Sequence, residues 1–166
     1  MKKSRNRKPG LFLAVVCLSA PVLAETKATE VAAKPVHGEY IDWRLLAVSH
    51  REDKNTLRAI LGNDIAITAA RKDQTKPWPD GSILAKVVWK DSTHPSWPQA
   101  VIPGEFASAE AMVKDSAKYP STGGWGFGHW EAGKLVMHEE SKARECFACH
   151  APMKYNDYVY TFSALK

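Results

Sequence analysis

Five consecutive residues near the C-terminal end, Cys146-Phe147-Ala148-Cys149-His150, combine two thiols and an imidazole at a spacing that suits one cofactor. On a helix the thiols lie about one turn apart, so both can add to the vinyl groups on one edge of a porphyrin. The imidazole that follows directly can then bind the iron as its proximal ligand. The motif therefore predicts one haem c, attached through Cys146 and Cys149, with His150 on the iron.

Three other interpretations of this motif have less support: a thioredoxin-like redox pair, half of a zinc site, and a chance run. A structural zinc site normally has four ligands, and the chain has no second pair of closely spaced cysteines. A redox pair needs no histidine directly after it and usually lies at the start of a helix in an early βαβ unit. The sequence therefore favours the haem site.

Residues 1–24 have the composition of a secretory signal peptide. Five basic residues come first, with no acidic residue among them: Lys2, Lys3, Arg5, Arg7 and Lys8. An apolar run over 11–20 follows, and Val22-Leu23-Ala24 is a small-residue cleavage site. The run is too short to span a bilayer, and Cys17 follows Val16 rather than the small residue that a lipoprotein site requires. We predict export to the periplasm, where haem can be attached covalently, without a membrane anchor.

Removal of this segment changes the charge balance. The whole chain carries a formal charge of +5, from 23 Lys and Arg against 18 Asp and Glu. Five of the basic residues and none of the acidic ones precede Glu25, which leaves 18 of each in the mature chain. A neutral chain lacks the positive charge that nucleic-acid binding requires, so we predict no nucleic-acid partner.

The rest of the chain has the pattern of one β-rich α+β domain. Residues 25–38 carry little apolar weight and predict a flexible lead-in, so the haem domain is assigned to residues 39–166. Apolar residues alternate, as in half-buried strands, over 41–47, 56–61, 83–89 and 125–130. Short helices are predicted over 65–72, behind the capping residue Asn63, and over 142–150. Residues 94–104, with three prolines, predict a loop, 106–114 fit a strand or a helix, and 157–162 predict an extended segment.

Four further motifs give the chain a family resemblance. They are Trp-Pro-Asp-Gly-Ser-Ile-Leu-Ala-Lys at 78–86, Met-Val-Lys-Asp at 112–115, Gly-Gly-Trp-Gly-Phe at 123–127 and Asn-Asp-Tyr-Val-Tyr at 156–160. With the haem motif, they make residues 40–162 similar to the cytochrome P-460 family, which includes the β-type cytochromes c′. The resemblance implies an antiparallel sheet with a few short helices, one haem c and a homodimer. It also implies hydroxylamine or nitric oxide as the small molecule that meets the haem.

The same resemblance gives Lys86 a role. In the cytochrome P-460 branch a lysine is bonded to the porphyrin edge, and the fifth residue after Asp80-Gly81 is Lys86; in the cytochrome c′-β branch this bond is absent. The residues alone leave both open. Leu84 and Val88 flank Lys86 on one face of its strand, and burial there would remove its proton and make it a nucleophile. An ordinary strand lysine would instead lay its stem over these neighbours and reach water.

Other residues are candidates for the surroundings of the haem. A sixth iron ligand could come from a histidine, although surface or packing roles are commoner: His37, His50, His94, His129 and His138. Methionine ligands are less expected, because Met112 and Met137 suit the core and Met153 is too close to His150 in sequence. Charged candidates for a distal pocket are Arg44 and Glu105, for which a salt bridge or solvated charge is the commoner role.

The aromatic residues Trp125, Phe127 and Trp130 are expected in the core or in the wall of the haem pocket. They alternate with Gly126 and Gly128, which would leave a flat strand face against which a large group can lie.

Three functions fit these residues. An enzyme would oxidise hydroxylamine or nitric oxide at an open iron and pass electrons to a soluble redox partner. A binding protein would hold nitric oxide on a five-coordinate haem without turnover, and an electron carrier would have a six-coordinate haem. A polar distal residue favours the enzyme, an apolar lid favours the binding protein, and a Met or His on the iron favours the carrier.

Overall fold

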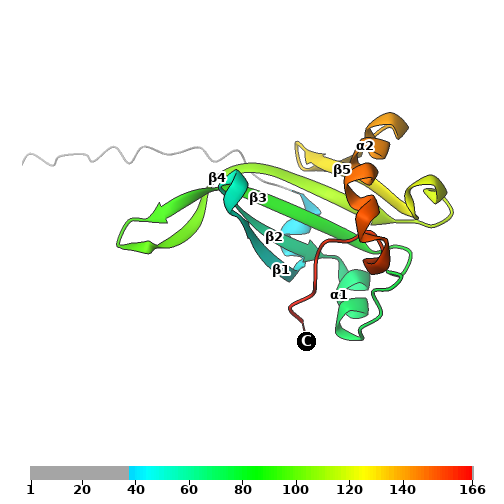
Figure 1. Cartoon of the computed structure of the whole chain (residues 1–166), viewed down its shortest axis with the longest axis horizontal. Helices are drawn as coiled ribbons and strands as arrows, with labels where there is room; N and C mark the ends of the chain where they lie inside the picture. The colour runs from blue at the N-terminus through cyan, green and yellow to red at the C-terminus, as the bar shows by residue number, and fades with distance from the viewer. Residues whose placement is uncertain (1–37, 166) are drawn as a thin grey trace, which may run out of the picture. The chain divides into compact units, whose positions relative to one another are not determined.

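A six-stranded antiparallel sheet forms the centre of the computed structural model, which describes residues 38–165 (Figure 1). Its strands are β1 (Arg44–Arg51), β2 (Thr56–Gly62), β3 (Ile83–His94), β4 (Trp97–Lys114), β5 (Trp125–Glu131) and β6 (Lys134–Met137). Each strand pairs with the next one along the chain, so the sheet is a meander. The predicted β-rich α+β fold is confirmed; the predicted signal peptide, almost all of the lead-in, and His37 lie outside the described residues.

Two α-helices, α1 (Asp64–Arg71) and α2 (Glu140–His150), pack on this sheet (Figure 1). The Asn63 side chain caps α1, as predicted, because its Oδ1 accepts a hydrogen bond of 3.0 Å from the backbone N–H of Ala66. Short 3-10 helices cover Glu39–Asp42, Glu52–Lys54, Pro120–Thr122 and Ala151–Asn156. No helix in the described part of the chain has both the length and the apolar character needed to cross a membrane.

Two predictions about the strands are wrong. The segment 41–47 does not begin as a strand, because the backbone turns as a 3-10 helix that buries Tyr40 against Trp130, with ring centres 4.5 Å apart. The segment 94–104 is not a loop, because β3 and β4 continue as a two-stranded arm that turns between His94 and Trp97. Prolines are tolerated there because β2 pairs with β3 only as far as Lys90, which leaves the arm with free edges.

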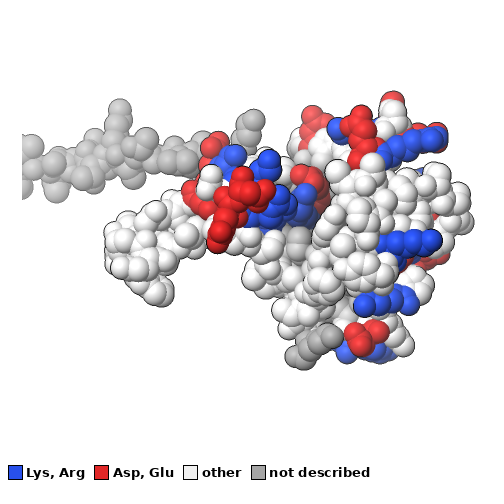
Figure 2. All heavy atoms as spheres, viewed as in Figure 1, with Lys and Arg blue, Asp and Glu red and all other residues white. Residues whose placement is uncertain are grey.

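This arm carries no charged residue between Asp91 and Glu105, and Figure 2 shows it as an uncharged projection. Residues 106–114, which fitted either a strand or a helix, form part of β4. β4 pairs with β5 only from Glu110 onward, so the part of β4 before Glu110 has no partner on that edge among the described residues.

Apolar side chains cover both faces of the sheet. On one face α1, α2 and the C-terminal residues enclose a core that includes Leu46, Ile67, Leu84 and Trp125. On the other face Tyr40, Ala85, Val87 and Ala109 form a smaller cluster, packed with partly buried residues such as Trp43 and Trp130. The alternation of β3 explains this division, since Leu84 and Lys86 face the first core and Ala85 and Val87 face the second.

Candidate haem site

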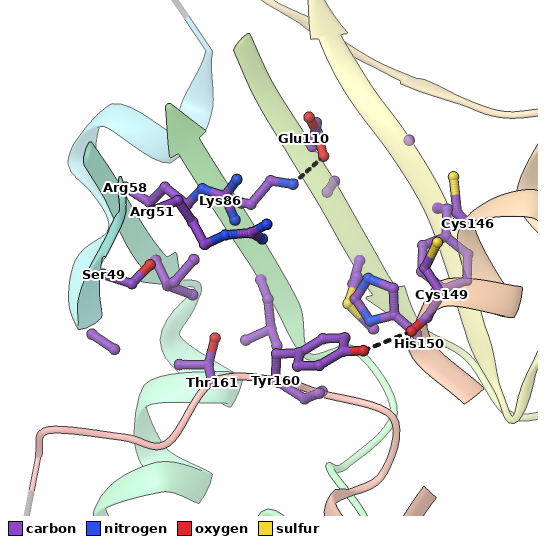
Figure 3. Close-up of a pocket in the computed structure, with 18 of the residues that line it drawn as sticks. Ser49, Arg51, Arg58, Lys86, Glu110, Cys146, Cys149, His150, Tyr160 and Thr161 are labelled. Atoms are coloured by element: carbon purple, nitrogen blue, oxygen red, sulfur yellow. Dashed lines mark hydrogen bonds and ion pairs between the residues drawn. The ribbon is translucent and has the colours of Figure 1, made fainter. Parts of the chain in front are cut away.

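The first face of the sheet, α2 and residues 159–162 enclose a cavity of about 900 Å³ (Figure 3). This volume lies in the range of roughly 300–1,000 Å³ that is usual for ligand and cofactor sites. The three residues that the sequence predicts to hold a haem, Cys146, Cys149 and His150, all line it. They lie together at one side of the cavity because they occupy the last turns of α2, which packs on β5.

The His150 ring is held in one tautomer by the backbone. Its Nδ1 lies 2.8 Å from the carbonyl oxygen of Tyr158. Since a carbonyl oxygen only accepts hydrogen bonds, Nδ1 carries the hydrogen and Nε2 keeps a free lone pair. Burial lowers the pKa of His150, which favours the neutral ring. A neutral imidazole with its second nitrogen hydrogen-bonded to the backbone is the usual form of an iron or zinc ligand.

The two cysteines differ in their surroundings. Cys146 is partly buried against the core, and burial raises the pKa of its thiol, whereas Cys149 is exposed. Both thiols are free. The backbone carbonyl of Cys149 accepts a hydrogen bond of 2.8 Å from the Tyr160 hydroxyl, which ties the C-terminal residues to the end of α2 (Figure 3).

Behind His150, the carboxylate of Asp157 joins segments that are far apart in sequence. It accepts hydrogen bonds from the Lys114 ammonium, 2.9 Å from both oxygens, and from the backbone N–H of Trp78 at 2.9 Å. The Lys114 side chain is only 3% exposed, so this is a buried ion pair. The Trp125 indole donates to the Asp157 carbonyl at 2.8 Å. The next carbonyl along the chain is that of Tyr158, which orients His150.

The four motifs at 78–86, 112–115, 123–127 and 156–160 thus meet around Asp157. Lys114 Nζ also donates to the carbonyl of Gly123, at 3.0 Å. A side chain at Gly123 would collide with the Tyr158 ring, and the positive φ of 66° at Gly123 also favours glycine. These motifs therefore build the support of the segment that orients His150.

A charged pair lies in the cavity wall opposite the histidine. Lys86 on β3 faces Glu110 on β4 across the sheet register, and Lys86 Nζ is 2.5 Å from Glu110 Oε2 (Figure 3). The Ser108 hydroxyl donates to the other carboxylate oxygen at 3.2 Å. Partial burial acts to raise the pKa of Glu110. The hydrogen bond and charge of Lys86, the hydrogen bond from Ser108 and the charge of Arg58 outweigh this effect and hold the pKa below its ordinary value.

Lys86 is less shielded than its neighbours in sequence suggest. Leu84 and Val88 are buried, as expected, but the Lys86 side chain is 35% exposed. The difference arises because the side chain crosses toward β4 to meet a carboxylate. This partner could not be predicted, since a single sequence does not reveal the strand register that sets Glu110 beside Lys86.

Arg51 and Arg58 also line the cavity, although neither was predicted from the sequence. A signal for Arg58 was present. In the strand 56–61 the residues Leu57, Ala59 and Leu61 share one face, so Arg58 must lie on the other. The pairing of β2 with β3 then brings Arg58 to the face of Lys86, which belongs to the cavity.

The family comparison agrees with this geometry. The family model of cytochrome P460 matches residues 38–161. The chain belongs to the cytochrome P460 family. Its members are haem-binding cytochromes, and the cavity of this cytochrome P460 fits such a group in size, in its pair of thiols beside a free imidazole nitrogen, and in its arginines. No curated protein matches the chain in sequence.

Several predicted candidates lie away from the cavity wall of this cytochrome. Arg44 forms an exposed ion pair with Asp64 at 2.6 Å, and Glu105 lies exposed on the arm. His50 contacts Asp91 at 2.7 Å, and His94 Nδ1 accepts a hydrogen bond from the backbone N–H of Ser96 at the tip of the arm. These residues hold the structural roles that were the commoner expectation for them.

Others do reach the wall. His138 and Met112 line the cavity, and His138 stacks on His129 with ring centres 5.1 Å apart. Phe127 lines it as well, 5.3 Å from the His150 ring.

The two glycines of β5 differ in their surroundings, because Gly128 lines the cavity whereas Gly126 has a different neighbour from the one expected. At Gly126, the large group that occupies the space of a side chain is the Tyr119 ring, together with the tip of Met137. Trp125 is fully buried in the core, and Trp130 packs on the opposite face of the sheet, beside Tyr40 and Trp43.

Proposed function

We propose that this cytochrome P460 is exported to the periplasm, carries one haem c, and oxidises hydroxylamine or nitric oxide. In this proposal Cys146 and Cys149 hold the porphyrin edge, and His150 Nε2 holds the iron. Bound haem supplies an iron that accepts electrons from the substrate one at a time and passes them to a soluble redox partner. The resemblance within the family also supports a homodimer.

The Lys86–Glu110 pair is the observation that carries this proposal. Oxidation of a nitrogen hydride releases protons, which a base inside the site must take up. Glu110 offers a carboxylate in the cavity wall, oriented by Ser108 and Lys86. A charged, hydrogen-bonded group of this kind is the polar feature that distinguishes an enzyme site from an inert trap.

A nitric-oxide-binding protein without turnover is the second candidate. Its support is the apolar part of the same wall, formed by Ile60, Leu84, Met112 and Phe127. An electron carrier is third, and it requires Met112 or His138 on the iron.

Covalent attachment is tested by mass and by extraction. The intact cytochrome is expected to have the mass of the chain after Ala24 plus one haem, and the haem should stay with the protein in acidified butanone. A Cys146→Ser/Cys149→Ser variant should release its haem under the same conditions, because no thioether remains. Cys17, which the proposed cleavage removes, offers the control: Cys17→Ser should change neither result. Haem extracted from the unaltered protein would contradict the proposal.

The optical spectrum of the dithionite-reduced cytochrome tests Lys86. A bond between Lys86 and the porphyrin should shift the Soret band far to the red of an ordinary haem c, and Lys86→Ala should remove the shift. Lys118→Ala, which alters an exposed lysine outside the cavity wall, is the control. An ordinary high-spin spectrum that Lys86→Ala leaves unchanged would favour the nitric-oxide-binding protein, and a low-spin six-coordinate spectrum would favour the carrier.

A further inference from the structure

We propose that Arg58, assisted by Arg51, binds the propionate carboxylates of the haem. This inference rests on the proposed haem site and gives a role to the residues at the end of the cavity that lies away from the cysteines. The two arginines lie across the cavity from Cys146 and Cys149 (Figure 3).

The placement follows from the sheet order. α2 packs on β5, whereas Arg51 and Arg58 project from β1 and β2, and β3 and β4 lie between β2 and β5. At the usual spacing of about 4.8 Å between strands, β2 and β5 are roughly 14 Å apart. A porphyrin attached by its vinyl groups to the cysteines of α2 would reach toward the end of the cavity that Arg51 and Arg58 line. The other edge of the porphyrin carries the two propionates.

The Arg58 guanidinium lacks a partner of its own. Its Nε is buried and has no hydrogen-bond acceptor among the described residues. Leaving a buried donor unsatisfied is costly, and most such groups in proteins are paired. The nearest carboxylates are already engaged, since Glu110 binds Lys86 and Asp53 binds Arg51 at 2.5 Å. Arg58 is therefore a half-buried cation with a buried, unpaired Nε, and it faces a cofactor-sized cavity without an ion-pair partner among the described residues.

A second cation beside Arg58 makes an anion at this place more favourable. Burial and the positive charge of Arg51 lower the pKa of Arg58, and they outweigh the opposing effect of the Glu110 and Asp53 carboxylates. A guanidinium presents parallel N–H donors that match the two oxygens of a carboxylate. The hydroxyls of Ser49 and Thr161 line the same end of the cavity and add donors. Two carboxylates on one edge of a flat ring suit this set.

The test compares the purified holoprotein with its Arg58→Met and Arg44→Met variants. Arg58→Met keeps an unbranched stem and removes the guanidinium with its charge. Arg44→Met removes an exposed arginine that pairs with Asp64 away from the cavity. The reduction potential is measured from pH 5 to pH 9, and infrared difference spectra follow haem labelled with ¹³C in the propionate carboxylates.

We expect Arg58→Met to lower the reduction potential, because a positive charge near the iron stabilises the reduced form. The propionate pKa should rise without its cation, so that the potential of the variant gains a pH-dependent step at neutral pH and the labelled carboxylate band shifts. Arg44→Met should match the parent protein, and Arg58→Lys should restore the potential in part.

A parent-like potential and carboxylate band in Arg58→Met would overturn the inference while leaving the haem site intact. A free anion such as nitrite provides the alternative. If nitrite perturbed the spectrum of the parent protein but not that of Arg58→Met, and the substitution left the propionate band unmoved, Arg58 would bind a free anion and the inference would be overturned. Failure of the parent chain to attach haem would instead contradict the proposed function.

Discussion

Replacing Asp157 with alanine is expected to lower the free energy of unfolding by about 3–5 kcal/mol. The change removes the carboxylate from a buried pair and leaves the Lys114 ammonium, whose side chain is 3% exposed, without its counter-ion. It also frees the backbone N–H of Trp78, which donates to the same carboxylate. Urea unfolding of the purified cytochrome measures the loss.

Two further variants locate the cause of that loss. Asp64→Ala removes an exposed pair with Arg44 and should cost about 1 kcal/mol or less. Lys114→Met added to Asp157→Ala should recover part of the stability, because the uncompensated charge is then gone. A loss below 1 kcal/mol in Asp157→Ala would show that the Lys114–Asp157 pair does not hold the C-terminal residues in place.

The contrast between Asp157 and Cys146-Phe147-Ala148-Cys149-His150 shows what the sequence could and could not reveal. The haem motif could be recognised in the sequence because its chemistry depends on the spacing of a few residues on one helix. The strand alternation that set Lys86 and Arg58 on the cavity face was equally local. Asp157 instead forms hydrogen bonds with residues that are 32 to 79 positions away, and the residues next to it in sequence do not predict these contacts.

The two errors in the strands have a related physical cause. Ile41 belongs to an alternating pattern, but the burial of Tyr40 against Trp130, which is far away in sequence, decides the backbone conformation there. Proline is excluded from strands that are hydrogen-bonded on both edges, so the prolines of 94–104 indicated a loop. Only the sheet register shows that the outer edges of the arm are unpaired in the described part of the chain, which lets a strand hold these prolines. Glu110 was missed for the same reason, since its role depends on which residue of β3 lies opposite.

The largest expected effect on activity comes from Glu110→Gln, which should slow hydroxylamine oxidation by roughly 10²–10⁴-fold in kcat. Glutamine keeps the shape of the side chain and can still accept from Ser108, but it cannot take up a proton. Because the Glu110 side chain is about half exposed, the free energy of unfolding of the protein should change little. Glu105→Gln, on the same strand but outside the cavity, should leave kcat unaltered.

The pH dependence of kcat separates a base from a residue that only shapes the cavity. Glu110 acts as the carboxylate, so activity is present above its pKa and is lost as the pH falls through that value. The pair with Lys86 holds the pKa below its ordinary value of 4.5, against the partial burial that acts to raise it. Lys86→Met removes the opposing charge, so the pKa should rise and the acid limb of the profile should move to higher pH.

The same shift is expected wherever Lys86 gives up its charge by bonding to the porphyrin, which would bring Glu110 closer to the pKa that suits a base near neutral pH. Parent-like turnover in Glu110→Gln, or an acid limb that Lys86→Met leaves in place, would show that another group takes up the proton.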